Sequence, residues 1–461
     1  MAMSTTELTG DVVRRGDPRY EAARVGFNRL YSRYPEAIVF CRDTADVVNA
    51  VGWARKAGLA FRARSGRHCL EGWSAVDDGL VIDMSQMKST EIDAASKTAI
   101  LGAGLNQLEA VIALGEAGFA APTGIEGTVG LVGATLGGGL GPLTRNYGMA
   151  SDNLLAAEVV VASADGAATA IIADGENNSD LLWALRGAGN GNFGIVTSLT
   201  CKVHPLTQTI YLVAAWRGLN DLQEVFEAWQ RTAPHLDYRL TSQLEIHRDE
   251  IRLFAVLACG SEAETTQMLE PILSIGQPHV TTKDANWADN YAGLQIPIDQ
   301  EPANWKFFSQ FISEPFPPDA IGLIGSLMAR APTSDCNYFT NAFGGAVKNS
   351  EPSGGSAFAH RDAIFYAEPG AGWGTRGEEV LAPDDPLTPE CLTWIADFGE
   401  ALRPYVNGAY PAVPNAGMLE WQTAYWGPNV EQLRTIKTKY DPDNVFNFDQ
   451  SLPPSAGGRG A

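Results

Sequence analysis

The N-terminal part of the chain alternates between short apolar runs and segments in which apolar residues recur every three or four positions. Between Thr44 and Gly58 the spacing predicts a helix that Thr44 caps and Gly58 ends. Residues 59–63 alternate as a strand does, and residues 79–84 form an apolar run typical of a buried strand. Apolar positions from 105 to 112 mark another helix. This part of the chain therefore mixes short strands with helices.

Further along, two apolar runs at 154–161 and 170–173 flank Asp165-Gly166. An Asp-Gly pair between apolar runs predicts a β-hairpin. Residues 180–186 have helical spacing and precede a second glycine-rich segment, 187–197.

The pattern changes after Pro205. Residues 209–214 and 251–257 alternate or run apolar as strands, and residues 222–232 have helical spacing. These patterns predict an antiparallel sheet backed by helices. A chain of 461 residues is too long for one ordinary core, so we expect a second domain over 206–408.

One segment is unusually rich in glycine, with nine glycines in the 25 residues from Gly124 to Gly148. We expect neither a helix nor an ordinary strand there, because each glycine gives up packing and costs backbone entropy. One interpretation is a backbone in close contact with a large flat or phosphorylated ligand. The other is a series of tight turns in a β-rich domain.

A second stretch, Arg64-Ser-Gly-Arg-His-Cys-Leu-Glu-Gly72, directly follows the strand predicted at 59–63. Ser65 and Gly66 would lie where the chain leaves a sheet edge, and free backbone N–H groups there can cradle an anion. By itself His68 is more simply a surface or core histidine without chemistry.

Composition limits the partners. The formal net charge is −21, from 54 acidic and 33 basic residues, and no segment concentrates Lys and Arg. This argues against nucleic acid and anionic membranes as partners.

Six scattered cysteines indicate reduced thiols rather than a metal site or disulfide framework. Residues 1–8 carry no signal-peptide pattern and no apolar run approaches membrane-spanning length, so we expect a cytoplasmic protein.

Together the 64–72 stretch and the glycine-rich run resemble the flavin domain of the berberine bridge enzyme-like oxidases, within the vanillyl-alcohol oxidase type of FAD-linked oxidases. The resemblance implies an α+β fold, with a two-lobed PCMH-type FAD-binding domain and a substrate domain built on an antiparallel sheet backed by helices. It also implies that the 64–68 loop holds the FAD pyrophosphate and that His68 bonds covalently to the flavin 8α-methyl group. Arg67 replaces the family's second glycine, so we expect a looser loop.

Many family members add a second covalent link from a cysteine in a Cys-Pro-x-Val-Gly motif. Here the matching run is Glu126-Gly-Thr-Val-Gly130. Because Glu126 cannot form a thioether, we expect a single covalent bond.

The segment Gly187-Ala-Gly-Asn-Gly-Asn-Phe-Gly194 only half satisfies a dinucleotide-binding GxGxxG pattern. Its order of helix, glycines and strand argues against an NAD-binding Rossmann domain and resembles an element of the flavin family. The C-terminal stretch from Trp421 to Phe446 resembles the family's closing motif. The resemblance thus implies that residues 1–205 bind FAD, that 206–408 form the substrate domain, and that 409–461 return to the FAD-binding domain.

The residues that the resemblance assigns to cofactor binding are Arg64, Ser65, Gly66, Arg67, His68, Cys69, Gly124, Thr128, Val129, Gly130, Gly133, Ala134, Gly141, Tyr147, Gly148, Asn153, Gly194, Val196, Tyr425, Asn429 and Asn444.

The catalytic base is less clearly marked. The family's usual second tyrosine in a Tyr-x-Asn-Tyr run corresponds to Val413 here, which argues against sugar oxidation by that residue. Candidates are Glu368, ranked first, and Tyr366, two residues apart on one face of a predicted strand, and His247. The alternative for each is a solvated strand face. No cluster has metal-ligand spacing and no Gly-x-Ser-x-Gly motif occurs.

The residue patterns by themselves indicate only a ligand-binding enzyme of two domains. The family resemblance implies more: an FAD-dependent oxidase with one histidyl link, acting on a small or medium organic alcohol or amine with dioxygen as acceptor. The alternatives are a biosynthetic tailoring flavoenzyme, either a monooxygenase or a multi-step oxidase, and a non-catalytic flavin-binding protein.

Overall fold

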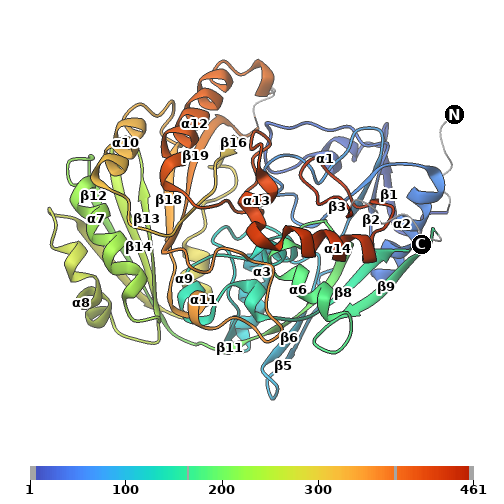
Figure 1. The fold of residues 1–461 in the computed structure, drawn as a ribbon, viewed down its shortest axis with the longest axis horizontal. Coiled ribbons are helices and arrows are strands. Elements are labelled where there is room, and N and C mark those ends of the chain that lie inside the picture. The colour runs from blue at the N-terminus through green and yellow to red at the C-terminus, as the bar shows by residue number, and fades with distance from the viewer. Residues whose placement is uncertain (1–6, 164–165, 378–381, 456–461) are drawn as a thin grey trace.

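The computed structural model describes residues 7–163, 166–377 and 382–455. Residues 1–6, part of the segment predicted to carry no signal peptide, and Asp165 of the predicted turn lie outside these ranges. Figure 1 shows the middle of the chain in the left half of the molecule and the N-terminal strands in the right half. The C-terminal helices α13 (Trp421–Trp426) and α14 (Val430–Tyr440) return toward the right half.

The right half contains two sheets. In the first, β1 and β2 are antiparallel and the other neighbours parallel, in the order β1 (Asp11–Arg14), β2 (Ala37–Phe40), β4 (Leu80–Asp83) and β3 (Phe61–Arg64). The second is antiparallel throughout, in the order β5 (Thr90–Asp93), β6 (Thr98–Gly102), β10 (Ile195–Lys202), β8 (Leu154–Ala162) and β9 (Ala168–Ala173). The predicted hairpin is the β8–β9 pair, and the predicted strand at 59–63 ends at the sheet edge as β3.

Short elements complete this half. They are α1 (Tyr20–Arg24), α2 (Thr44–Ala57), α3 (Gln107–Glu116), α4 (Leu131–Gly137), α5 (Thr144–Tyr147), α6 (Ser179–Ala188), the 3₁₀ turns η1 (Ala150–Asn153) and η5 (Gly427–Asn429), and the β7 (Phe119–Ala120) and β11 (His204–Pro205) pair.

Helix α2 ends at Gly58 as predicted, in a left-handed conformation with φ of 66°. Its N-cap, however, is Asp43 and not Thr44. The Asp43 carboxylate accepts a 2.9 Å hydrogen bond from the backbone N–H of Asp46, whereas the Thr44 hydroxyl donates to Glu158 on β8. An extended residue whose side chain reaches the third N–H satisfies the open helix end, and Asp43 has that conformation.

The glycine-rich run contains a helix, so the expectation of no helix there was wrong. Helix α4 lies between Gly130 and Gly138. Its residues Leu131, Val132 and Leu136 are buried in the core of this half. Burial of these apolar side chains outweighs the backbone entropy that the glycines cost.

The left half contains the predicted antiparallel sheet. Its order is β15 (His279–Ala285), β12 (Thr209–Arg217), β14 (Glu250–Ala258), β13 (Leu240–Ile246), β18 (Asn337–Ala342), β19 (Phe365–Thr375) and β16 (Pro302–Phe307), and β17 (Gln310–Ile312) also pairs with β19. The helices and turns of this half are α7 (Leu222–Thr232), α8 (Glu262–Leu273), α9 (Trp287–Gly293), α10 (Pro318–Met328), α11 (Gly345–Asn349), α12 (Thr388–Leu402), η2 (Ala233–His235), η3 (Ala382–Asp384) and η4 (Arg403–Tyr405).

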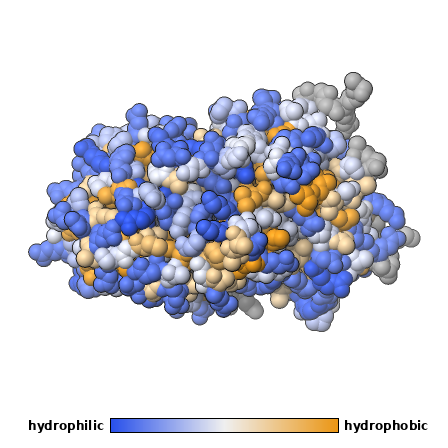
Figure 2. Space-filling model, turned by 90° about the horizontal axis from the view of Figure 1, so that it is seen from below, coloured by the Kyte–Doolittle hydropathy of each residue, from blue (hydrophilic) through white to orange (hydrophobic). Residues whose placement is uncertain are grey.

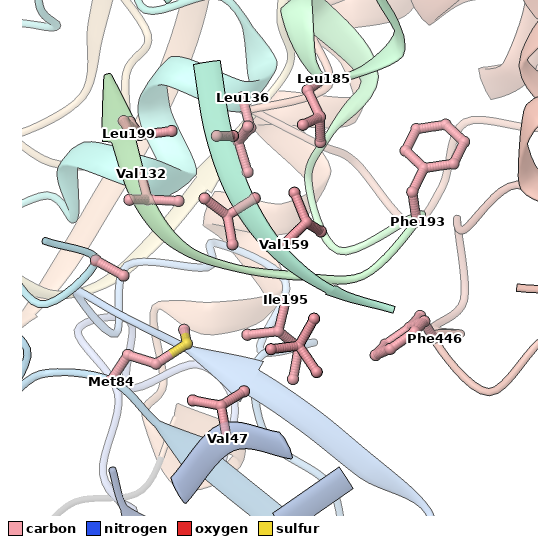
Figure 3. Packing of buried hydrophobic residues seen from close by; sticks show 14 of the residues in the cluster. Val47, Met84, Val132, Leu136, Val159, Leu185, Phe193, Ile195, Leu199 and Phe446 are labelled. Atoms are coloured by element: carbon pink, nitrogen blue, oxygen red, sulfur yellow. The ribbon is translucent and has the colours of Figure 1, made fainter. Parts of the chain in front are cut away.

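Each half has its own core. One cluster takes its buried residues from the chain up to Val203 and from Ala357 and 409–452, and Figure 3 shows Val47 of α2, Val132 of α4, Ile195 of β10 and Phe446 packed in it. The other takes them from Ile210 to Leu402. The separation of the cores agrees with the two expected domains, whose boundaries at 206 and 408 stay predictions.

The face of the molecule in Figure 2 is mostly hydrophilic, with hydrophobic patches among the polar residues. Among the described residues, no helix combines the length and apolar character that crossing a membrane requires.

The Gly66→Ala substitution should destabilise the protein, because a Cβ at Gly66 would lie 2.1 Å from the backbone nitrogen of Gly130. We expect a loss of about 1–3 kcal/mol, typical of overpacking between groups that cannot move apart. The matched control is Gly52→Ala in α2, where nothing lies within 4 Å of the new Cβ. That change should stabilise by about 0.5–1 kcal/mol. Thermal unfolding followed by circular dichroism measures both, and equal midpoints for Gly66→Ala and wild type would contradict the close contact.

Candidate active site

A cavity of about 1010 Å³ is lined by residues from both halves of the molecule. The right half supplies residues 61–70 and part of the segments 124–140 and 190–196, and the C-terminal segment adds 410–414 and 446–448. The left half supplies one face of its sheet.

The strand pattern of the left sheet explains this arrangement. Side chains alternate between the two faces of a strand. On β19, Phe365 and Ala367 pack into the core beneath the helices, while Tyr366 and Glu368 line the cavity. The neighbouring strands also contribute to the cavity wall. The other cavity-lining residues of the sheet are Tyr211, Gln243, Glu245, Arg252, Phe254, Pro302, Trp305, Phe307, Asn337, Phe339 and Asn341. The face that carries Tyr366 and Glu368 is therefore turned into the cavity and not toward the outer surface.

An ion pair and a hydrogen bond fix the start of the loop that follows β3. The Arg64 guanidinium is buried and lies 2.7 Å from the Asp83 carboxylate, and the Ser65 hydroxyl donates to the backbone oxygen of Ala103 over 2.5 Å. Gly66 and Gly130 approach backbone to backbone, since a Cβ on either would lie within 2.5 Å of the other's backbone nitrogen. Only glycine permits this contact.

Arg67 departs from the expectation of a looser loop. Its φ of 63° is left-handed, a conformation that favours glycine. The side chain is held by Asp83 at 3.4 Å and by the backbone oxygen of Ala22 at 3.2 Å. The backbone therefore keeps a glycine-like conformation even though arginine occupies the position.

His68 lines the cavity with a fixed ring. Its Nε2 lies 2.8 Å from the Thr128 hydroxyl, and the imidazole stacks on Phe27 with ring centres 4.0 Å apart. Burial, aided by the Arg376 charge, lowers the pKa of His68 to about 3. The imidazole is therefore neutral at pH 7 and keeps a nitrogen lone pair.

The side chains of two glutamines form hydrogen bonds with the backbone at the start of the glycine-rich run. Gln107 accepts from the backbone N–H of Gly124 over 2.5 Å and donates to the Glu126 backbone oxygen over 2.7 Å. Gln295, from the left half, accepts from the N–H of Gly127 over 2.5 Å. These contacts join the two halves at the cavity.

The C-terminal segment is tied to the cavity by a buried lysine. Lys437 donates over 2.6 Å to the Asp441 carboxylate and to the backbone oxygens of Asn192 and Phe446. Both side chains of the Lys437–Asp441 pair are fully buried. This network fixes residues 446–448 beside the segment 190–196.

Tyr366 and Glu368 form a hydrogen-bonded pair, in which the Tyr366 hydroxyl donates to the Glu368 carboxylate. Burial raises the pKa of Glu368 to about 7; the Tyr366 hydrogen bond opposes this rise and the Glu245 charge adds to it. Burial and the Glu368 charge raise the pKa of Tyr366 far above its ordinary value. Of the two groups, Glu368 is thus the one able to accept a proton near neutral pH.

His247 has a different environment. Its Nε2 lies 3.4 Å from the Glu245 carboxylate, which also accepts a 2.6 Å hydrogen bond from Asn337. Burial disfavours a charge on His247, but Glu245 outweighs it and raises the pKa of His247. A raised pKa favours the charged form of a histidine, and the charged form cannot accept a proton.

Most of the predicted site residues lie around this cavity. The three catalytic candidates line it, as do the predicted cofactor residues Arg64, Ser65, Gly66, Arg67, His68, Cys69, Gly124, Val129, Gly130, Gly133, Ala134, Gly194 and Val196. Thr128 reaches it through its contact with His68. Burial raises the pKa of the Cys69 thiol, so it is not a thiolate at neutral pH.

The remaining predicted cofactor residues do not line the cavity among the described residues: Gly141, Tyr147, Gly148, Asn153, Tyr425, Asn429 and Asn444. Their contacts indicate a role in holding loops. Asn153 donates to the backbone oxygens of Tyr147 and Met149, and Tyr425 donates to Gln450. Contact of these residues with a cofactor stays a prediction.

Several lining residues were not predicted from the sequence, among them Gln107, Gln295, Gln243, Asn341 and Phe448. The strand alternation around His247 could have indicated Gln243. No local signal marks Gln295, because its role depends on contact with a segment 168 residues away.

The right half of the cavity fits a dinucleotide cofactor. The backbone N–H groups of residues 65–68 have no backbone partner in the described ranges, and beside them the Gly66–Gly130 contact leaves no side chain in the way. Such a group of N–H donors can cradle a pyrophosphate. No group of side chains suited to hold a metal ion occurs among the residues described.

Comparisons with known proteins agree with this geometry. The family model described as FAD binding domain matches residues 35–189, and the model described as berberine and berberine like matches residues 404–453. Two proteins of Bacillus subtilis (strain 168), both named uncharacterized FAD-linked oxidoreductases, match over nearly their full length. YgaK is 37% identical, and the match covers 98% of this chain and 98% of YgaK. YvdP is 36% identical, and the match covers 98% of this chain and 100% of YvdP.

Among solved structures, BBE-like 1 of Physcomitrella patens superposes with a TM-score of 0.88 at 26% identity, covering 97% of this chain and 98% of that chain. The fold and the site therefore define an FAD-linked oxidoreductase. The chain belongs to the berberine bridge enzyme-like family of these enzymes.

Removal of the buried lysine should destabilise the protein strongly. Lys437→Ala leaves Asp441 buried without its partner, which typically costs about 3–5 kcal/mol. The control is Lys439→Ala on the same helix, because Lys439 pairs with Asp180 at the surface and its loss should cost less than about 1 kcal/mol. Denaturant unfolding of the two variants compares them. Similar losses would show that the buried network contributes no more than a surface pair.

Proposed function

We propose that this protein is an FAD-dependent oxidase with a single covalent link between His68 and the flavin 8α-methyl group. It oxidises a small or medium organic alcohol or amine and transfers the electrons to dioxygen. In this proposal residues 1–205 and 409–461 hold FAD, and residues 206–408 cover it and shape the substrate site. The observation that carries the proposal is that the Tyr366–Glu368 pair and His68 line one cavity.

The histidyl link is supported by the state of His68. Its ring is neutral, stacked on Phe27 and held at Nε2 by Thr128, so a nitrogen nucleophile has a fixed orientation. Glu126 stands where many relatives have a cysteine, which supports one link and not two. When bound, FAD supplies the chemistry that accepts electrons from the substrate and delivers them to dioxygen.

The base is assigned to Glu368. A base must be within hydrogen-bond reach of the substrate O–H or N–H and have a pKa near the working pH. Glu368 meets the second condition, with a pKa of about 7, and lies in the cavity wall where a substrate would bind. Tyr366 orients the Glu368 carboxylate by its hydrogen bond. The partly buried Glu245–His247 pair and the Gln243–Asn341 amide pair, the latter 2.8 Å apart, add polar groups that can bind substrate.

The rival functions give different products. A substrate panel that yields hydrogen peroxide in proportion to product supports the oxidase. Incorporation of oxygen from ¹⁸O₂ into the product would instead indicate a monooxygenase. Bound flavin that no compound in the panel reduces would indicate a non-catalytic flavin-binding protein.

The covalent link has a direct test. After trichloroacetic acid precipitation the flavin should stay with the polypeptide, and His68→Ala should release it to the supernatant while the loop still binds FAD. The control His279→Ala changes an exposed histidine on β15 and should keep the flavin attached. Absorbance of pellet and supernatant measures the outcome, and extractable flavin in the wild type would refute the link.

The Glu368→Gln substitution should lower the rate of flavin reduction about 10²–10⁴-fold in anaerobic stopped flow. Reoxidation by dioxygen should hardly change, because it needs no substrate base. In the wild type the reduction rate should rise with pH through about 7, since only the ionised carboxylate accepts a proton. Tyr366→Phe removes a hydrogen bond to the charged form and should move this rise to higher pH. Reduction of Glu368→Gln at the wild-type rate would place the base elsewhere.

A further inference from the structure

A chain of hydrogen bonds links His68, through Thr128, to Glu126, which also lines the cavity. The Thr128 hydroxyl lies 2.8 Å from His68 Nε2 and 2.7 Å from Glu126 Oε1. The backbone N–H of Thr128 also donates to Glu126 Oε1, over 3.2 Å. The Glu126 carboxylate thus receives both donors of one residue.

Donor counting determines the direction of this chain. A hydroxyl has one hydrogen to donate, and a carboxylate can only accept. Because Thr128 donates to Glu126, it must accept from His68, which places the imidazole hydrogen on Nε2. The lone pair is then on Nδ1, for which no hydrogen-bond partner occurs within the described ranges.

The surroundings keep the ring in this state. Phe27 stacks on the imidazole with an angle of 19° between the planes, which fixes the ring plane. The charged groups nearby are Arg376, whose charge acts on His68, and Glu301, whose carboxyl interacts with both Arg376 and Glu126. Burial in the first place, and the Arg376 charge in addition, disfavour a second proton on His68, so the ring stays neutral.

We propose that Thr128 and Glu126 form a proton relay that sets the tautomer of His68 and removes its Nε2 proton during attachment to the flavin. The proposal rests on the covalent link of the proposed function. The bond that forms joins His68 Nδ1 to the 8α carbon, and one C–H bond of the methyl group breaks. Two protons leave, one from that C–H bond and one from Nε2 through Thr128 to Glu126. Two electrons pass through the flavin to dioxygen, which with two protons becomes hydrogen peroxide.

Glu126 thereby acquires a function of its own. Relatives with a cysteine at this position use it for a second bond, whereas here the carboxylate serves the first bond. Glu126 and Thr128 are positioning and proton-transfer residues for attachment. Neither is required to bind FAD non-covalently, because the Gly66–Gly130 contact and the 65–68 loop do not depend on their side chains.

The test follows the rate of attachment in the full-length protein, expressed under riboflavin limitation and then incubated with FAD in air-saturated buffer. The variants are Thr128→Val, which removes the hydroxyl at constant shape, Glu126→Gln, which keeps an acceptor but removes the charge, and the conservative Thr128→Ser. The control is Glu301→Gln, which removes a neighbouring carboxyl group outside the hydrogen-bond chain. Acid-stable flavin and the mass of the His68 peptide are measured over time.

Thr128→Val and Glu126→Gln should attach flavin about tenfold to 10²-fold more slowly than wild type, the lower range of general-base effects. Thr128→Ser and Glu301→Gln should attach it at nearly the wild-type rate. Higher pH should speed Glu126→Gln more than wild type, because solvent base replaces the missing carboxylate. A purely structural role for Glu126 would not produce this difference in pH profile.

Other results separate the possible failures. A wild type that never gains acid-stable flavin refutes the covalent link and the relay with it. A wild type that gains it, with both Thr128→Val and Glu126→Gln attaching at the same rate, overturns the relay alone. If a variant fails to fold, ¹⁵N NMR of histidine-labelled, flavin-free wild type decides, since a hydrogen on His68 Nδ1 instead of Nε2 contradicts the proposal.

Discussion

The backbone contact between Gly66 and Gly130 is the constraint on which the site depends. Through this contact the loop after β3 packs against the start of α4. The two segments are far apart in the sequence and meet at one edge of the cavity. Since neither position has a Cβ, the two backbones reach a distance that any other residue pair would prevent. The same contact brings His68 within hydrogen-bond distance of Thr128.

The electrostatics of the cavity follow from burial and from the nearest charge, and they differ from one group to the next. His68 is partly buried under the influence of the Arg376 charge and stays neutral, whereas His247 is partly buried beside Glu245, which raises its pKa. Glu368 is also partly buried, and this burial, aided by the Glu245 charge, raises its pKa to about 7 in spite of the Tyr366 hydrogen bond. Three groups with ordinary side-chain chemistry thereby differ in the protonation state that their surroundings favour.

The cavity also depends on contacts that connect the two halves and the C-terminal segment. Gln295 reaches from the left half to the glycine-rich run, and Lys437 holds the C-terminal segment against residues 190–196. Tyr410 contributes in the same way, because its hydroxyl accepts the backbone N–H of Gly139 over 2.7 Å. Each contact uses a polar side chain to satisfy backbone groups at the cavity wall, where an unpaired donor or acceptor would be costly.

The sequence by itself determined the local structure: the helix at 222–232 has the predicted bounds, Gly58 ends α2, and the loop at 64–68 leaves an edge strand. The spacing of apolar residues and the positions of glycines suffice to predict these features, because the interactions that form them lie within a few residues of one another. Only the tertiary structure decided that α4 forms in spite of its glycines and that Tyr366 and Glu368 face the cavity and not solvent. Alternation predicts that two residues share a face, but what covers that face, and hence the pKa of Glu368, depends on segments hundreds of residues away.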